Sequence, residues 1–359
     1  MADVTSTTAA DAPGGPCDLP WGSIRAVPLG SLAVPTNRPR RLRRTAAMRD
    51  LVAETHVRVD DLVAPLFVRE GISSPQPITS LPHVVQHTRD SLRAEVTGLA
   101  DLGVKAVILF GVPAQKDAVG SGASDPQGIV QLALADLRTD VGDDLVVITD
   151  LCVDEYTDHG HCGIVDEHGV VDNDATVELY AQAALAQARA GSQVIAPSGM
   201  MDGQVAAIRD ALDGEGFDDI AILAYAAKYA SGLYGPFRDA VDVEIADGGD
   251  RKGYQQDYRN VREAQREIDL DIAEGADMIM IKPALAYLDV IADAASRVDL
   301  PIAAYHVSGE YAMIHAAAQQ GWIDGDAVAI EHLTAIKRAG ANIILTYFTR
   351  WFAETASAS

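Results

Sequence analysis

The chain has 359 residues, of which 48% are hydrophobic, enough to bury the core of one large domain or of two ordinary ones. Its formal net charge of −24 repels nucleic acids and anionic membranes, so neither is expected as a partner. The sequence lacks a long apolar run and a secretory signal, and it has only three cysteines, so we expect a cytoplasmic protein with reduced thiols.

The first 36 residues are rich in Pro, Gly, Ser, Thr and Ala and lack hydrophobic periodicity, which predicts a flexible or extended arm. A short basic cluster follows, and the total charge favours its docking on another subunit over contact with nucleic acid. We therefore expect an N-terminal arm over residues 1–45, partly flexible, and a catalytic domain over residues 46–359. The cluster consists of Arg38, Arg40, Arg41, Arg43 and Arg44.

From about residue 60, short β-branched apolar runs alternate with longer Ala-rich amphipathic stretches. The runs are continuously apolar, which is typical of parallel strands buried on both faces. In the stretch 172–191, Asn173 or Asp174 can cap a helix that Gly191 can end. The predicted strands occupy residues 62–68, 104–110, 145–151, 192–198, 220–228, 276–282, 301–307 and 341–347.

Eight strands that each lead into a helical stretch predict an α/β fold, the (β/α)8 or TIM barrel. A doubly wound open sheet is the alternative, although no G-x-G-x-x-G or phosphate-binding loop follows any strand. Because barrel enzymes place their chemistry at the C-terminal ends of the strands, we expect the polar residues at those ends to share one mouth. These residues are Asp150, Cys152, Ser198, Lys228, Lys282, Ser308 and Tyr347.

Two of these residues are lysines that close buried strands. Desolvation lowers the pKa of a buried lysine, and the neutral amine attacks ketones to form a Schiff base. Lys282 follows the run MIMI and precedes Pro283, and Lys228 ends the previous strand. Repulsion between two neighbouring ammonium groups would lower one pKa further. The pair implies two substrate molecules, or one Schiff base with a helper cation. For Lys282, the alternative is a lysine at a strand end that extends its amine to solvent.

The loop after the third strand carries two cysteines and an acidic residue. Cys152, Asp154 and Cys162 could bind a metal with one position open, as in catalytic zinc sites. An unliganded cysteine pair is the alternative. His159 and His161 could be ordinary loop histidines whose hydrogen bonds are satisfied without a metal.

The Gly-rich segment between the fifth and sixth strands resembles a lid. Its basic and amide side chains suit a substrate that bears a carboxylate, unless they are ordinary surface residues. They are Arg238, Arg251, Lys252 and Gln255.

Seven motifs resemble those of the 5-aminolevulinate dehydratase family. The resemblance as a whole runs in family order from about Arg38 to Phe352. They are GADMIMIKPALAY, DLCVDEYTDHGHCG, APSGMMDGQV, AKYASGLYGPFRDA, GDRKGYQ, YHVSGEY and ILTYFTRWF. The resemblance implies a homo-octameric barrel with an N-terminal arm and no organic cofactor. It also implies condensation of two 5-aminolevulinate molecules to porphobilinogen, an early step of tetrapyrrole (heme) synthesis.

The resemblance also implies residue roles. Lys282 would hold the first substrate in a site termed P, and Lys228 the second in a site termed A, with Asp150 and Ser198 at the reacting centre. The implied substrate-binding residues are Ser308 and Tyr347 for the P-site carboxylate, Arg238, Arg251 and Gln255 for the A-site carboxylate, and Tyr234 and Phe237.

Two metals follow from the same resemblance. Zinc-dependent members have a cysteine where this chain has Asp154, and other members replace the cysteines with acids; the two remaining thiolates favour zinc here. An allosteric magnesium ion would bind Glu267 directly, with Asp202 and Asp271 holding its waters and Arg38 of a neighbouring arm close by. A solvated acidic helix face is the alternative.

For the whole chain, a class I Schiff-base aldolase and a non-catalytic metal-binding barrel are the competing functions.

Overall fold

The computed structural model describes residues 37–246 and 249–357. The chain divides into two compact units, residues 1–54 and residues 55–359. In the described part of the first unit, a 3-10 helix (Pro39–Arg43) precedes helix α1 (Ala46–Leu51), whose first turn is capped by the hydroxyl of Thr45. Residues 1–36 of the expected arm lie outside the described residues, and the arm itself stays a prediction.

The second unit is built on a ring of parallel strands. Each strand pairs with the next, and β10 pairs with β1 through Leu62 opposite Ile344, which closes the ring. This closure confirms the predicted (β/α)8 barrel and excludes the open sheet. The strands are β1 (Leu62–Arg69), β4 (Ala106–Val112), β5 (Val146–Leu151), β6 (Val194–Pro197), β7 (Ala221–Lys228), β8 (Met278–Lys282), β9 (Ile302–His306) and β10 (Ile343–Thr346).

Two short strands lie beside the ring and were not predicted. Strand β3 (Val85–His87) runs parallel to the end of β1, and β2 (Gln76–Pro77) pairs antiparallel with β3. Strands of two and three residues are too short to produce a recognisable hydrophobic pattern.

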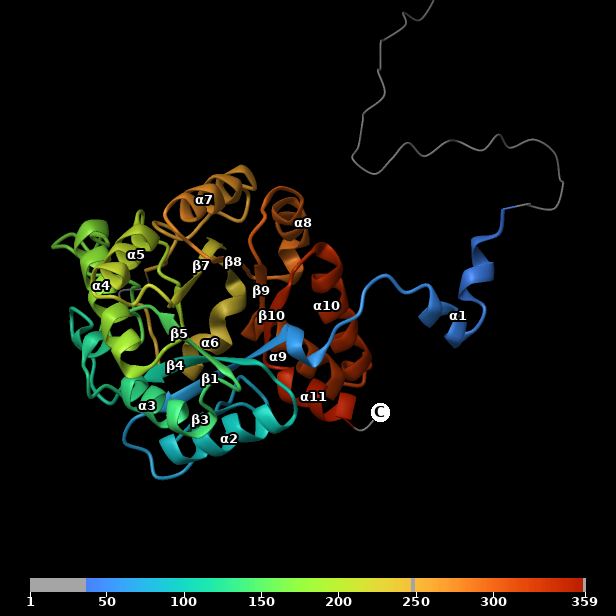
Figure 1. Cartoon of the computed structure of the whole chain (residues 1–359), viewed down its shortest axis with the longest axis horizontal. Coiled ribbons are helices and arrows are strands. Elements are labelled where there is room, and N and C mark those ends of the chain that lie inside the picture. The colour runs from blue at the N-terminus through green and yellow to red at the C-terminus, as the bar shows by residue number, and fades with distance from the viewer. Residues whose placement is uncertain (1–36, 247–248, 358–359) are drawn as a thin grey trace, which may run out of the picture. The chain divides into compact units, whose positions relative to one another are not determined.

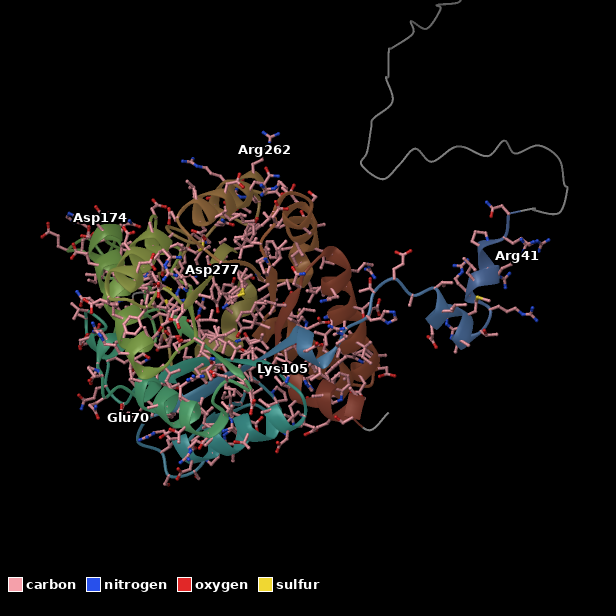
Figure 2. The ribbon with its side chains drawn as sticks, viewed as in Figure 1. Arg41, Glu70, Lys105, Asp174, Arg262 and Asp277 are labelled. Atoms are coloured by element: carbon pink, nitrogen blue, oxygen red, sulfur yellow. The ribbon has the colours of Figure 1, made fainter. Side chains whose placement is uncertain are left out.

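Helices cover the outside of the strands (Figure 1). Asp174 and Arg262 extend outward from two of them (Figure 2), as charged residues on a solvated helix face should. No helix among the described residues is long and apolar enough to cross a membrane. The helices of this unit are α2 (Arg89–Asp101), α3 (Ile129–Val141), α4 (Asn173–Ala190), α5 (Gln204–Gly214), α6 (Gly235–Ala240), α7 (Arg262–Ala273), α8 (Leu288–Arg297), α9 (Ser308–Gln319), α10 (Gly325–Ala339) and α11 (Thr349–Ser357).

The start of α4 corrects one prediction. Asp172, rather than Asn173 or Asp174, caps the helix, because its carboxylate accepts a hydrogen bond of 3.1 Å from the backbone of Ala175. The predicted end is confirmed: Gly191 has a φ of 106°, a left-handed conformation that glycine adopts without steric cost.

Candidate active site

Lys282 lies in a cage of aromatic rings at the C-terminal end of β8. Its side chain is buried, with 5% of the residue exposed, and its Nζ lies 4.4 Å from the ring centroid of Tyr305. The rings of Phe237, Tyr234 and Tyr225 follow at 5.0, 5.2 and 5.2 Å. The cage excludes water from the amine.

Lys228 is the direct neighbour of Lys282 across the two strands, since their Cα atoms are partners in the register of β7 and β8. Lys228 is equally buried and donates a hydrogen bond to the backbone carbonyl of Ser198. The Ser198 hydroxyl in turn donates to the Asp150 carboxylate at 3.0 Å. The structure therefore brings together the four residues for which we predicted catalytic roles.

The two lysines have opposite pKa shifts. Burial, and then the neighbouring charge of Lys228, lower the pKa of Lys282 to about 7. Burial also acts to lower the pKa of Lys228, but the nearby Cys162, Cys152 and Asp154 outweigh it and raise the net value. The amine of Lys282 therefore loses its proton at lower pH than the amine of Lys228. Burial raises the pKa of Asp150 to about 6, against the effect of both lysines.

Tyr225 was not identified from the sequence, although its ring lies close to the amines of both lysines. It stands three residues before Lys228, so in a regular strand the two side chains would point to opposite faces. The register between β7 and β8 shifts between Ala224 and Ala227, and the Tyr225 ring centroid lies 5.5 Å from Lys228 Nζ. A strand irregularity of this kind leaves no signal in the hydrophobic pattern.

Three predicted carboxylate-binding residues carry donors that lack a partner. Nε of Arg238, Nε of Arg251 and Nε2 of Gln255 are buried, and none makes a hydrogen bond with the described residues. Buried donors are almost always paired in native proteins, so unpaired ones indicate a missing acceptor. A substrate carboxylate offers such acceptors. Lys252 of the same segment is exposed and pairs with Asp250 instead.

The predicted P-site residues lie at the ends of β9 and β10. The Ser308 hydroxyl accepts a hydrogen bond from the Phe237 backbone at 3.0 Å, which joins the start of α9 to α6. The hydroxyls of Tyr347 and Tyr305 are 3.2 Å apart, so Tyr347 connects directly to the cage around Lys282. Tyr234 donates to the backbone carbonyl of Tyr229 at 2.7 Å, which fixes its ring over the amine.

The cysteine loop forms a compact group of potential metal ligands. The ligand atoms of Cys152, Asp154 and Cys162 lie within 4.8 Å of one another, and all three residues are buried. No other such group of three occurs among the described residues. His159 and His161 bond to Ala118 and Tyr254 and do not belong to it. Two thiols and a carboxylate in this arrangement fit a zinc-like metal.

The structure pairs two residues to which the sequence analysis gave separate roles. Arg251 donates to Asp154 Oδ2 at 2.7 Å and to the Gly160 carbonyl at 2.8 Å, and both charged side chains are buried. Burial acts to raise the pKa of Asp154, but the charges of Arg251 and Lys228, together with hydrogen bonds from neighbouring side chains, hold it below its usual range. A lid arginine is thus joined to the cysteine loop.

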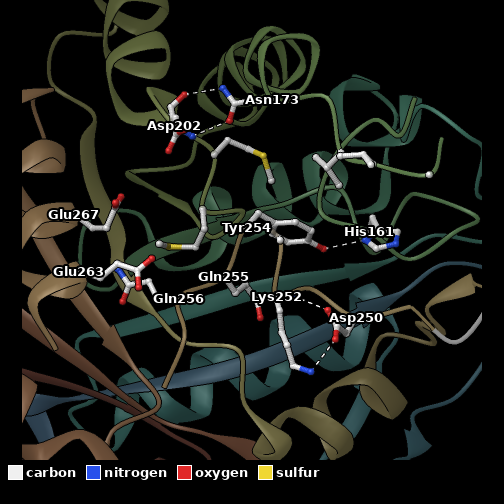
Figure 3. Close-up of a pocket in the computed structure, with 16 residues that line it drawn as sticks. His161, Asn173, Asp202, Asp250, Lys252, Tyr254, Gln255, Gln256, Glu263 and Glu267 are labelled. Carbon is white, nitrogen blue, oxygen red and sulfur yellow. Dashed lines mark hydrogen bonds and ion pairs between the residues drawn. The ribbon is translucent and has the colours of Figure 1, made fainter. Parts of the chain in front are cut away.

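A separate cavity of about 450 Å³ carries part of the predicted magnesium site (Figure 3). Glu267 and Asp202 both line it, and burial followed by Asp202 raises the pKa of Glu267. Asp271 does not line the cavity; burial, then Glu274 and Glu267, raise its pKa to about 8. Arg38 belongs to the first unit of the chain.

Comparisons with known proteins show the family to which the chain belongs. The family model for delta-aminolevulinic acid dehydratase matches residues 36–355. The Streptomyces coelicolor enzyme of that name is 57% identical over 89% of this chain and 97% of its own length. The Mycobacterium tuberculosis enzyme is 58% identical, over 88% and 95%. A Toxoplasma gondii delta-aminolevulinic acid dehydratase, solved with its product porphobilinogen, has a TM-score of 0.87 and 42% identity, covering 90% of this chain and 92% of that one. The chain belongs to the delta-aminolevulinic acid dehydratase family.

Proposed function

We propose that this chain condenses two molecules of 5-aminolevulinate to porphobilinogen and two waters, as a step of heme synthesis, through imines on Lys282 and Lys228. The observation that carries the proposal is the pairing of two buried lysines of opposite pKa shift in one site. The aldolase needs only one lysine, and a non-catalytic metal-binding barrel needs neither.

Lys282 acts first, because its amine is already neutral in about half of the molecules at pH 7. The amine adds to the substrate ketone and water leaves, with the two hydrogens of the water coming from the amine and its oxygen from the ketone. Asp150 has a pKa of about 6, so it can both donate and accept protons during this exchange. Ser308 and Tyr347 bind the carboxylate of this first substrate.

The second substrate occupies the side of Lys228. The unpaired donors of Arg238, Arg251 and Gln255 bind its carboxylate, and Tyr234 and Phe237 cover the reacting centre. Zinc held by Cys152, Asp154 and Cys162 would supply Lewis-acid chemistry at this substrate. One oxygen of Asp154 accepts a hydrogen bond from Arg251.

Substrate entry requires the segment between β7 and β8 to move. The space among the lysines, Asp150 and Arg251 is about 10 Å³, room for about one water molecule. We therefore propose that the described residues 232–246 and 249–255 belong to a lid that opens for substrates and closes over the imines to exclude water.

A magnesium ion at Glu267, with Asp202 and Asp271 holding its waters, would act at a distance from the lysines. Magnesium retains most of its waters and needs only one or two direct carboxylates, which suits a half-buried Glu267 beside an open cavity. We propose that the ion favours a homo-octamer in which Arg38 of a neighbouring arm lies close to it. This part of the proposal rests on the resemblance to the family alone. If magnesium changes neither activity nor sedimentation, or changes both equally in Glu267→Gln, this part fails.

The central experiment uses the whole protein with 5-aminolevulinate as its only substrate. We expect the pyrrole product, and we expect borohydride reduction with substrate present to attach mass to the peptide that contains Lys282. Label only on other peptides, or a fully active Lys282→Ala variant, would contradict the proposal. A cytoplasmic location stays a prediction.

A further inference from the structure

Glu310 is a buried carboxylate without a cationic partner. It lies in the first turn of α9 with 1% of its surface exposed, and no described Lys, Arg or His forms an ion pair with it. Instead it accepts two backbone hydrogen bonds of 2.7 Å, one from Leu285 and one from Val307. A buried carboxylate whose hydrogen bonds come from backbone donors ties together the segments that supply those donors.

These two segments carry the groups assigned to the first substrate. Leu285 lies three residues after Lys282, and Val307 directly precedes Ser308. The Ser308 segment has little room to shift, because a Cβ added to Gly309 would lie 2.5 Å from the carbonyl oxygen of Leu233. Glu310 therefore links the loop that follows the imine-forming lysine to the loop that presents the carboxylate-binding serine.

Helix capping alone does not account for this arrangement. The bond from Val307 is the one expected of a glutamate in the first turn of a helix. The bond from Leu285 comes from a different strand end and does nothing for the helix. Burial raises the pKa of Glu310 to about 7, so keeping the carboxylate in this place has a cost that a neutral glutamine cap would avoid.

We propose that Glu310 is a positioning residue that fixes the separation between Lys282 and Ser308 and thereby selects keto acids by chain length. This inference rests on the proposed function, in which Lys282 takes the ketone and Ser308 the carboxylate. In 5-aminolevulinate two methylenes separate these groups. A fixed separation admits that spacing and rejects a longer one, because the two ends can be bound together only at one length.

The test compares two amine-free keto acids, 4-oxopentanoate with two methylenes and 5-oxohexanoate with three. Each is incubated with the whole protein and borohydride, and the rate of labelling at Lys282 is measured by mass spectrometry. We expect the wild type to prefer 4-oxopentanoate. In Glu310→Gln, the amide NH₂ would face one of the two backbone donors and release one loop. The ratio of the labelling rate with 4-oxopentanoate to the rate with 5-oxohexanoate should then fall roughly tenfold, which corresponds to the loss of one charge-assisted hydrogen bond.

Glu310→Asp provides a second variant, since it keeps the charge but cannot reach both loops. Asp324→Asn is the matched control: Asp324 caps α10 by accepting from Ala327 at 3.1 Å, away from the lysines. A folded Glu310 variant with the wild-type preference would overturn the proposal, as would an equal loss of labelling with both acids, which indicates general loosening. If the wild type is never labelled at Lys282, the proposed function fails instead.

Discussion

Replacing Lys228 by methionine should raise the pKa of Lys282. The two residues are partners across β7 and β8, and the charge of Lys228 is the second cause of the low pKa of Lys282, after burial. Methionine is similar in length and flexibility, so the site stays filled while the charge disappears. Because Lys228 is proposed to hold the second substrate, we expect the variant not to complete the reaction, and the measurement therefore follows the first imine alone.

The magnitude follows from the neutral fraction of the amine. A lysine with the reference pKa of about 10.4 would be neutral in roughly one molecule in 2,500 at pH 7, whereas Lys282 is neutral in about half. Burial is the larger cause and persists in the variant. A neighbouring charge changes a pKa by about one or more. A rise of about one would reduce the neutral fraction at pH 7 roughly fivefold.

The assay is the rate of borohydride trapping of 4-oxopentanoate on Lys282 between pH 5.5 and 9. Because the neutral amine attacks, the rate should rise with pH around a midpoint near 7 in the wild type. In Lys228→Met the midpoint should move to higher pH, with a similar plateau. Lys105→Met is the control, since Lys105 is exposed and precedes β4 at the opposite end of the barrel. An unchanged or lower midpoint in Lys228→Met would refute the electrostatic coupling.

Three further predictions concern the metal loop and the barrel wall. Arg251→Met should lower the free energy of unfolding by about 3–5 kcal/mol in urea titrations, because it leaves Asp154 buried and unpaired; a loss below ~1 kcal/mol would contradict this. Cys152→Ser and Cys162→Ser should reduce bound zinc, and chelation should stop pyrrole formation while labelling of Lys282 continues; unchanged zinc content argues against the site. Burial, then His332, lower the pKa of His306 to about 3, so stability should fall as pH falls from about 6.5 towards 3, because the unfolded chain takes up a proton there that the folded chain does not. In His306→Gln the free energy of unfolding should fall less steeply with falling pH. An equally steep fall in the variant would contradict the assignment to His306.

Much of the barrel could be predicted because its strands are buried on both faces. Such strands produce continuous apolar runs, and all eight predicted runs overlap the observed barrel strands. The lysines were identifiable for the same reason, since a charged residue that closes an apolar run stands out. Parallel strands then bring the run ends to one mouth, which is how Asp150 and Ser198 come to meet Lys228.

The remaining features depend on contacts that no local pattern encodes. Arg251 and Asp154 are 97 residues apart in the sequence. Each had a predicted role of its own, Arg251 in the lid and Asp154 as a metal ligand, so nothing in either motif indicated that they pair. Tyr225 reaches the lysines only through the irregular register of β7. Glu310 looks like an ordinary first-turn helix residue until the bond from Leu285 is seen.

The opposite pKa shifts of the two lysines show why position decides reactivity here. Both lysines close an apolar strand, and both are buried to the same degree. Lys282 faces aromatic rings, which exclude water but provide no counter-charge strong enough to keep the ammonium form. Lys228 lies towards Cys162, Cys152 and Asp154, whose ionised forms stabilise its ammonium form. A cation bound by those groups would offset that charge, so metal binding and neutralisation of Lys228 are coupled. We therefore expect the first imine to form without a metal and the chemistry at Lys228 to depend on one.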